Sequence, residues 1–186
     1  MRKLLIAISL LLALGSSAQT KMSQVFRQMP DEIIPYLSEN NRLDLIDFAD
    51  SNMKAEVHNL LEGRSELKKM TDDYAFLSLN EASQIEMRLL DVSTPVDSSM
   101  SILCVVSTYG VGLRDSKVDF YSLKWKKLDS SQWAMLPPQS FIAALDEKLP
   151  VLTVSPLSDL DIEILNEKKT TKDLSKVLKW DGQMFK

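Results

Sequence analysis

The nine residues Gln84–Val92, QIEMRLLDV, decide the fold class of this 186-residue chain. Apolar and charged side chains alternate along them, in the order Ile85, Glu86, Met87, Arg88, Leu89. A period of two is typical of a β-strand whose side chains point alternately to two faces. The alternation therefore predicts a strand with one face buried and the other face exposed to solvent.

Three further runs rich in β-forming residues surround this stretch. They are DDYAFLSL (72–79), SILCVVST (101–108) and KVDFYSLKW (117–125). The segment Ile102–Val106 is apolar on both faces, which predicts a strand in the middle of the sheet. Four successive strands with short connections favour an antiparallel meander.

The N-terminal part, from Met22 to Gly63, has helical periodicity instead. A first helix carries Met22, Val25, Phe26 and Met29 and ends at Pro30. A second helix is predicted from about Ser38 to Met53, which places His58 near a helix end. Both helices present an apolar stripe to the sheet.

The second helix contains the acid-rich stretch NRLDLIDFAD (41–50). Projection at about 100° per residue puts Asp44 and Asp47 opposite the apolar stripe, with Asp50 at its margin. Arg42 falls inside the stripe, where its stem could snorkel to water. The stretch lacks the glycine and spacing of a calcium loop. We interpret these aspartates as a hydrated face and not as a metal or catalytic cluster.

The C-terminal part predicts a short helix capped by Ser140 and then more strands. Val151–Val154 and Leu160–Leu165 are expected to form a hairpin, and Asp181–Gly182 predicts a type I′ turn. The predicted fold class is α+β. N-terminal helices pack on an antiparallel, meander-rich sheet, and a β-hairpin lies at the C-terminus.

Residues 1–18 have the order of parts of a secretory signal peptide. Arg2 and Lys3 precede an apolar run, and Ser16-Ser17-Ala18 supplies small residues for cleavage. The run is shorter than the roughly 20 apolar residues of a membrane span, and the rest of the chain contains no transmembrane segment. Residues 19–186 are predicted to form one α+β domain in the periplasm or on the surface of a Gram-negative cell.

The net charge and the small number of cysteine and histidine residues limit the classes of partner and cofactor that we expect. Loss of Arg2 and Lys3 lowers the formal charge of −4 by two, to −6, which excludes general attraction to nucleic acid or anionic lipid. Cys104 is the single cysteine, so an intramolecular disulfide is excluded. With His58 as the single histidine, we expect no zinc site, no other metal and no cofactor.

Catalytic motifs are missing from the sequence. Cys104 lies in the most apolar run, where a thiol behaves as a small hydrophobe, and no Gly-x-Ser-x-Gly elbow occurs. Carboxylate pairs at Asp72-Asp73 and Asp159/Asp161 leave a glycosidase-type site open, because sequence cannot test their separation. Trp125, Trp133 and Trp180 could form a sugar platform, although such residues more often pack a sheet face.

One connection between strands is the candidate interaction loop. It is the longest of them, and its candidate contact residues are Tyr109, Gly110, Gly112 and Arg114. Two glycines without a third and without a following helix do not make a dinucleotide site. A flexible hairpin loop with adaptable contacts is the alternative that we retain.

Several segments together resemble a family of secreted proteins of unknown function from Gram-negative anaerobes of the gut and mouth. They are FRQMPDEIIPYLSENNRLDLIDFADSNMKAEV (26–57), MTDDY (70–74), EMRLL (86–90), DSKVDFYSLKW (115–125) and WDGQMF (180–185). The likeness is strong over about residues 24–125. It implies export and a single domain, and it carries no activity, cofactor or catalytic residue.

The functional hypothesis is an exported, non-catalytic module that binds a protein, a peptide or an envelope component. A secreted hydrolase of glycan or peptide that uses a carboxylate pair is the alternative, and a periplasmic folding or inhibitor module is a third. A binding module should show an exposed apolar patch or an uncovered sheet edge. A hydrolase should show a pocket in which two acids converge, one with a raised pKa.

Overall fold

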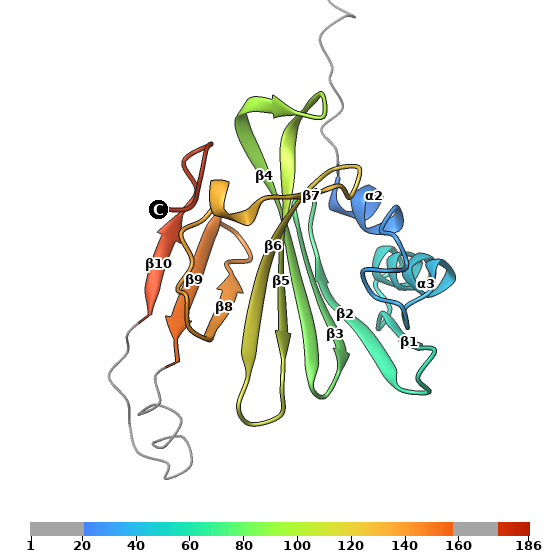
Figure 1. The fold of residues 1–186 in the computed structure, drawn as a ribbon. Helices are drawn as coiled ribbons and strands as arrows, with labels where there is room; N and C mark the ends of the chain where they lie inside the picture. The colour runs from blue at the N-terminus through green and yellow to red at the C-terminus, as the bar shows by residue number, and fades with distance from the viewer. Residues whose placement is uncertain (1–20, 158–174) are drawn as a thin grey trace, which may run out of the picture.

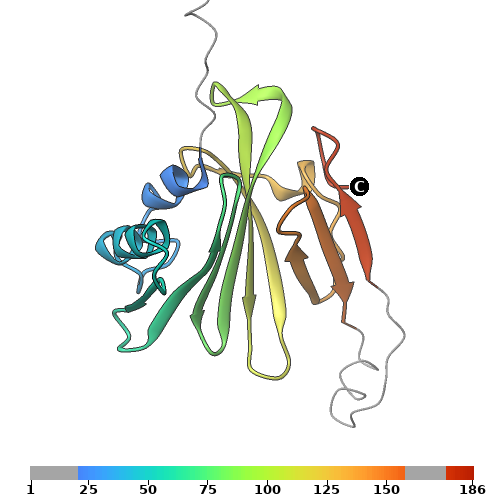
Figure 2. The same cartoon turned by 180° about the vertical axis from the view of Figure 1, so that it is seen from behind.

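The computed structural model describes residues 21–157 and 175–186, in which two helices and two antiparallel sheets form three layers (Figures 1 and 2). The predicted signal peptide and the predicted strand at Leu160–Leu165 lie outside the described residues. The observed architecture confirms the α+β class with its antiparallel sheet and C-terminal strand pair.

The larger sheet has seven strands in the order β1-β2-β3-β4-β5-β6-β7, each antiparallel to the next along the chain. Its strands are β1 (Glu56–His58), β2 (Arg64–Met70), β3 (Tyr74–Asn80), β4 (Ser83–Val96), β5 (Ser99–Tyr109), β6 (Asp115–Ser122) and β7 (Lys127–Leu128). The predicted meander is therefore confirmed and extended at both edges. The apolar run Ile102–Val106 lies in β5, an interior strand whose two faces are both buried there.

The smaller sheet has the order β10-β9-β8, from β8 (Phe141–Leu145), β9 (Val151–Pro156) and β10 (Lys176–Lys179). The prediction of a helix after Ser140 is wrong, because Phe141–Leu145 is extended and pairs with β9. The predicted type I′ turn at Asp181–Gly182 is also wrong, since only Gly182 has a positive φ there. Two consecutive positive φ angles, which that turn type requires, occur instead at Asp97 and Ser98, between β4 and β5.

The two predicted helices are α2 (Met22–Arg27) and α3 (Glu39–Asp50), followed by the short 3-10 helix η2 (Ser130–Gln132) after β7. Ser38 caps α3 in a capping box with Asn41. Helical structure does not continue to Gly63. Residues after Asn52, which has a left-handed φ, extend into β1, so His58 lies in an edge strand and not near a helix end.

One face of the large sheet is covered by α2 and α3. Their buried side chains, among them Met22, Phe26 and Leu45, form one hydrophobic core with the sheet residues Leu77 and Met87. A hydrogen bond also links helix α2 to the sheet. The indole Nε1 of Trp125 donates to the carbonyl oxygen of Val25 at 2.9 Å.

The opposite face of the large sheet is covered by the small sheet. A second core forms there, and it includes Cys104, Phe120, Leu152 and Phe185. Strand β4 contributes Glu86 and Arg88 to this face, and these side chains are buried, with residues 7% and 1% exposed. The prediction of a wet face on β4 is therefore wrong, because β8 lies across it.

Candidate functional site

Three loops lie together at one end of the large sheet, the lower end in Figure 1. They connect β1 to β2, β3 to β4 and β5 to β6. An antiparallel meander places every second connection at the same end, so loops about 50 residues apart in sequence become neighbours. The amide of Gly110 donates to the carbonyl oxygen of Ala82 at 2.8 Å, which joins the second and third loops.

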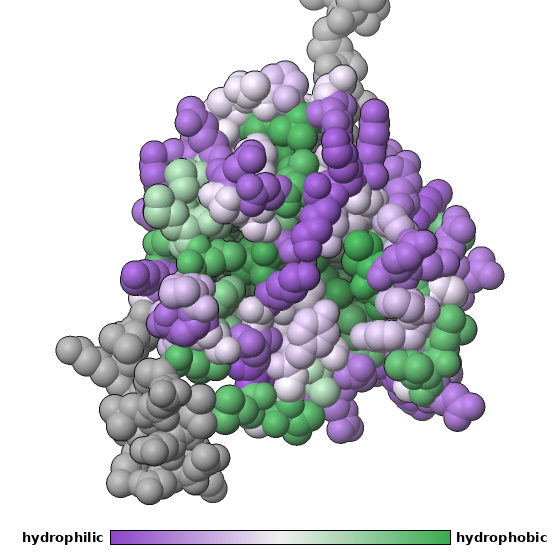
Figure 3. Space-filling model, in the orientation of Figure 1, coloured by the Kyte–Doolittle hydropathy of each residue, from purple (hydrophilic) through white to green (hydrophobic). Residues whose placement is uncertain are grey.

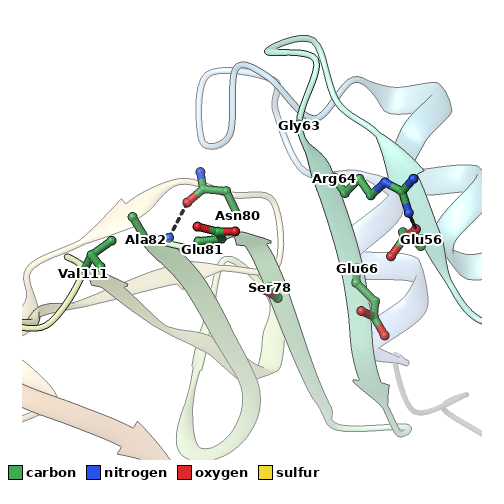
Figure 4. Close-up of a pocket in the computed structure, with 9 residues that line it drawn as sticks. All are labelled: Glu56, Gly63, Arg64, Glu66, Ser78, Asn80, Glu81, Ala82 and Val111. Atoms are coloured by element: carbon green, nitrogen blue, oxygen red, sulfur yellow. Dashed lines mark hydrogen bonds and ion pairs between the residues drawn. The ribbon is translucent and has the colours of Figure 1, made fainter.

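A groove of about 630 Å³ runs between these loops (Figure 4). Its lining comes from the three strands β1, β2 and β3 and from the three connections. The lining residues are Glu56, Gly63, Arg64, Glu66, Ser78, Asn80, Glu81, Ala82 and Val111. Polar side chains of β1, β2 and β3 therefore face the same hollow as the tip of the β5–β6 loop.

Two of the groove carboxylates are neutralised by neighbouring cations. Glu56 is bonded to Lys54 at 2.6 Å and to Arg64 at 2.8 Å, and Glu66 is bonded to Lys68 at 2.5 Å. The hydrogen bond from Lys54, with the charge of Arg64, lowers the pKa of Glu56. Glu56 therefore stays ionised at neutral pH and is unsuited to donate a proton as a general acid.

Exposed apolar side chains lie on two of the three loops at this end of the molecule, and Val111 among them lines the groove. The exposed fractions are 66% for Leu60, 67% for Leu61 and 77% for Val111, and Leu113 and Tyr109 are also exposed. Apolar surface is visible at the lower edge of Figure 3, over the ends of the β1–β2 and β5–β6 connections. Exposed apolar patches of this kind mark interaction sites in soluble proteins.

The predicted interaction loop forms part of this end of the molecule. Tyr109 is exposed at the end of β5, and the loop needs its first glycine. A Cβ at Gly110, whose φ is +116°, would lie 2.1 Å from the carbonyl oxygen of Leu113. Sequence reasoning missed Val111, the residue of the loop that lines the groove, although its place between two glycines marks the tip.

Arg114, the fourth predicted contact, does not line the groove. Its Nε atom is buried without a hydrogen-bond partner among the described residues, and its charge acts on Glu86. Burial raises the pKa of Glu86, and the backbone amide of Leu145 and the charge of Arg114 partly oppose the shift. This carboxyl lies between the two sheets and not in the groove.

Side-chain hydrogen bonds reach backbone carbonyl oxygens on both sides of the large sheet. At β1 the side-chain amide of Asn41 donates to the carbonyl oxygen of His58 at 3.1 Å. On the other side of the sheet the hydroxyl of Ser130 donates at 3.3 Å to the carbonyl oxygen of Val118, which lies in β6 before its pairing with the short edge strand β7. Each bond occupies one acceptor that an added strand would otherwise use.

The other predicted sites are dispersed. Asp44, Asp47 and Asp50 are all exposed, which confirms the hydrated face of α3. Arg42 does not snorkel. It is buried, and its Nη1 donates to Asp31 at 2.8 Å and to the carbonyl oxygen of Leu37 at 2.7 Å.

The adjacent carboxylates Asp72 and Asp73 point to different partners. Asp72 pairs with Lys21 at 3.2 Å, whereas Asp73 pairs with Arg88 at 2.6 Å. The second predicted pair, Asp159/Asp161, lies outside the described residues. Within residues 21–157 and 175–186, no three His, Cys, Asp or Glu side chains are placed to hold a metal ion.

The remaining candidates are structural. His58 is exposed in β1, and Cys104 is fully buried, where desolvation raises the pKa of its thiol. Trp125 is buried, and Trp133 stacks on Trp180 with 6.0 Å between ring centroids. No flat row of exposed tryptophans is present in the described part of the chain.

Comparisons with known proteins agree with this fold and add no activity. A family model described as "Protein of unknown function (DUF3256)" matches residues 13–182, and no curated protein matches the chain. A solved domain of an uncharacterized protein from Porphyromonas gingivalis W83 is similar, with a TM-score of 0.70 and 19% identity over 89% of this chain and 96% of that one. This likeness shows the fold alone. Among the described residues, no helix is long and apolar enough to cross a membrane.

Proposed function

The chain belongs to the DUF3256 family of proteins of unknown function, and we propose that it is an exported, non-catalytic binding module whose loop end contacts a protein, a peptide or an envelope component. The surface that we assign to this contact is the groove together with Leu60, Leu61, Tyr109, Val111 and Leu113. We call it the loop-end surface.

The proposal of export is supported by the first 18 residues. A basic start, an apolar run and a small-residue end stand in the order that a secretory signal peptide requires. The periplasm or the outer surface of a Gram-negative cell is the compartment that we infer. A fold held by burial, with one cysteine, needs no disulfide there.

The observation that carries the binding function is the grouping of exposed aliphatic side chains. Ten large hydrophobic residues of the described chain are exposed, and five of them belong to the loop-end surface. They come from the β1–β2 and β5–β6 loops, about 50 residues apart, and from the end of β5, and Val111 among them lines the groove. Exposing them to water is unfavourable, so a partner that covers them gains the free energy of burial.

A carboxylate hydrolase is the second candidate, because Glu56, Glu66 and Glu81 line the groove. A general acid at neutral pH needs a raised pKa. Glu56 has a lowered pKa, and the carboxyl with a raised pKa, Glu86, lies between the sheets. The geometry therefore favours binding over hydrolysis.

Site-specific photo-crosslinking tests the binding function. A photoreactive residue is placed at Val111 in one variant and at Asp44, on the exposed face of α3, in another. We expect a discrete adduct from position 111 in the cells that produce the protein, and none from position 44. Equal labelling from both positions, or none from position 111, would contradict the proposal.

A turnover assay tests the alternative. The purified protein is incubated with a panel of glycans and peptides, and Glu66→Gln and Glu81→Gln are assayed beside it. We expect no turnover by any of the three proteins. Hydrolysis that either substitution abolishes would establish the hydrolase instead.

A further inference from the structure

We propose that the groove receives an extended protein segment in which a basic side chain stands between aliphatic ones. This inference rests on the proposed function and adds the chemistry of the partner. Three features support it: the fixed β1–β2 and β5–β6 loops, which we call the two rims, the unpaired charges beside them, and the shape of the groove.

The first rim is held rigid by a buried asparagine. Asn59 accepts hydrogen bonds at its Oδ1 atom from the amides of Leu61, at 3.0 Å, and Gly63, at 3.2 Å. Its Nδ2 atom donates to Ser65 Oγ at 3.0 Å and to the Leu79 carbonyl oxygen at 3.3 Å. These bonds hold the β1–β2 loop in a conformation that leaves Leu60 and Leu61 exposed. The loop therefore has its binding conformation before a partner arrives.

The second rim is held by backbone contacts. The amide of Gly110 donates to Ala82, whose own amide donates to Asn80 Oδ1 at 2.8 Å. The backbone folds so closely here that a Cβ at Gly110 would lie 2.1 Å from the carbonyl oxygen of Leu113, so only glycine fits at the start of the loop that carries Val111. Rigid presentation of exposed aliphatic residues is what a binding surface needs, because little conformational entropy is lost on contact.

The charge that remains in and beside the groove is negative. Glu56 forms ion pairs with Lys54 and Arg64, and Glu66 forms an ion pair with Lys68. Glu81, in the groove lining, and Glu62, next to Gly63 at its edge, have no ion pair within the described part of the chain. A basic side chain is the complement of these two carboxylates.

A lipid surface fits this end of the molecule less well. The carboxylates of Glu62 and Glu81 stand beside the apolar tips, and they would be repelled by the negative potential of anionic lipids. The groove is also concave between its two rims, whereas insertion into a bilayer uses projecting tips alone. An extended segment fills such a hollow and places alternate side chains on its floor and its rims.

Fluorescence polarisation with defined peptides tests the inference. The probe is a labelled peptide with a central Leu-Lys-Leu flanked by Gly and Ser, and the comparison probes carry Leu-Glu-Leu or Asn-Lys-Asn in its place. We expect binding of the first probe only. Glu62→Gln/Glu81→Gln should weaken it about tenfold, because the lysine of the probe loses both carboxylates that attract it. Raised salt should weaken it as well.

The matched control is Asp44→Asn/Asp47→Asn, which removes two exposed charges from α3 and should leave binding unchanged. Equal binding of the Leu-Glu-Leu probe, or binding that survives Glu62→Gln/Glu81→Gln, would overturn the inference. Binding of the protein to phosphatidylcholine vesicles that is lost in Val111→Asp would overturn it in favour of a lipid surface. Self-association lost in Val111→Asp would do so in favour of a second copy. If no probe binds while photo-crosslinking from position 111 persists, the inference fails and the proposed function stands.

Discussion

The two faces of the large sheet are covered in different ways. On one face, α2 and α3 bury aliphatic and aromatic side chains against the strands. On the other face, the small sheet presents the edge of β8 to β4, β5 and β6. A helix satisfies its own backbone polar groups, but an edge strand does not, so the second face needs buried polar side chains.

Three side chains accept hydrogen bonds from backbone amides along β8, and we call this row of bonds the ladder. The amide of Phe141 donates to Asp115 Oδ1 at 3.2 Å and the amide of Ala143 to Ser116 Oγ at 3.0 Å. The amide of Leu145 donates to Glu86 Oε2 at 2.6 Å. Side chains of β4 and β6 thus take the place of a neighbouring strand. The two faces therefore differ in a general way: a polar residue in a strand can face the edge of a second sheet that packs on it, as in β4, and need not face water.

Arg88 completes the ladder. Its Nε and Nη2 atoms donate to the carbonyl oxygen of Asp146 at 3.1 and 2.8 Å. Its Nη1 atom bonds Asp73, and its guanidinium lies 5.4 Å from the centre of the Tyr74 ring. Every nitrogen of this buried cation therefore has a partner, which is the condition for its burial.

The helix face should be the more sensitive to loss of volume. Phe26→Ala removes a fully buried ring from α2 and should lower the free energy of unfolding by about 3–5 kcal/mol. Chemical denaturation measures this, with the exposed Val111→Ala as a control below about 0.5 kcal/mol. A loss under about 1 kcal/mol for Phe26→Ala would show that the helices contribute little to the fold.

The opposite face should be the more sensitive to loss of polar groups. Arg88→Met keeps much of the stem volume but leaves the carbonyl oxygen of Asp146 without its two donors. We expect a loss of about 2–3 kcal/mol in the same measurement. Asp73→Asn is the control, because Asp73 is half exposed and should cost less than about 1 kcal/mol. Equal losses would place the importance of Arg88 in its ion pair and not in its contact with β8.

A smaller effect should follow from one rung of the ladder. Ser116→Ala leaves the amide of Ala143 and the hydroxyl of Thr108 without this partner, and should cost about 1–2 kcal/mol. Ser107, on the neighbouring strand and the helix side of the sheet, is only partly buried. Ser107→Ala should change the free energy of unfolding by less than about 0.5 kcal/mol. No difference between the two variants would mean that the ladder is dispensable.

The smallest effect should be a pH dependence. The pKa of Glu86 is raised in the folded state above its ordinary value of 4.5, chiefly by burial. The folded protein therefore binds this proton more tightly than the unfolded chain, so the contribution to stability is fully present below about pH 4.5. It is lost as the pH rises through the folded pKa.

Glu86→Gln isolates this contribution, because an amide oxygen can still accept from Leu145. The stability of the wild type relative to Glu86→Gln should fall as the pH rises from about 4 towards 7. Denaturation of both proteins across that range gives the difference. A difference that is constant with pH, or that grows in the opposite direction, would contradict the burial of an ionisable Glu86 beneath β8.

Local patterns predicted the elements that depend on neighbouring residues. Runs rich in β-forming residues predicted β3 to β6, with alternation in β4, and helical spacing predicted α2 and an α3 that starts at about Ser38. The short segments Glu56–His58 and Phe141–Leu145 have too few apolar residues to distinguish a period of two from a helical period, so the prediction of helix there is wrong. Their extended form depends on pairing with β2 and β9.

The candidate site was predicted in part. Its β5–β6 loop stood out through Tyr109 and two glycines, but Arg114 turned out to lie outside the groove. The contribution of Leu60 and Leu61 was not predicted, because two leucines after a polar stretch look like buried residues. Only the orientation imposed by Asn59 shows that they face water.

By itself, the amino-acid sequence determined the helices α2 and α3, the central strands β3 to β6 with their antiparallel order, and the hydration of the α3 aspartates. These follow from the period of the hydrophobic pattern, which is a property of neighbouring residues. Only the tertiary structure decided that Glu86 and Arg88 are buried and that Val111 meets the β1–β2 loop across a groove. A pattern shows that a strand has two different faces, but what covers each face is set by residues far away in the chain.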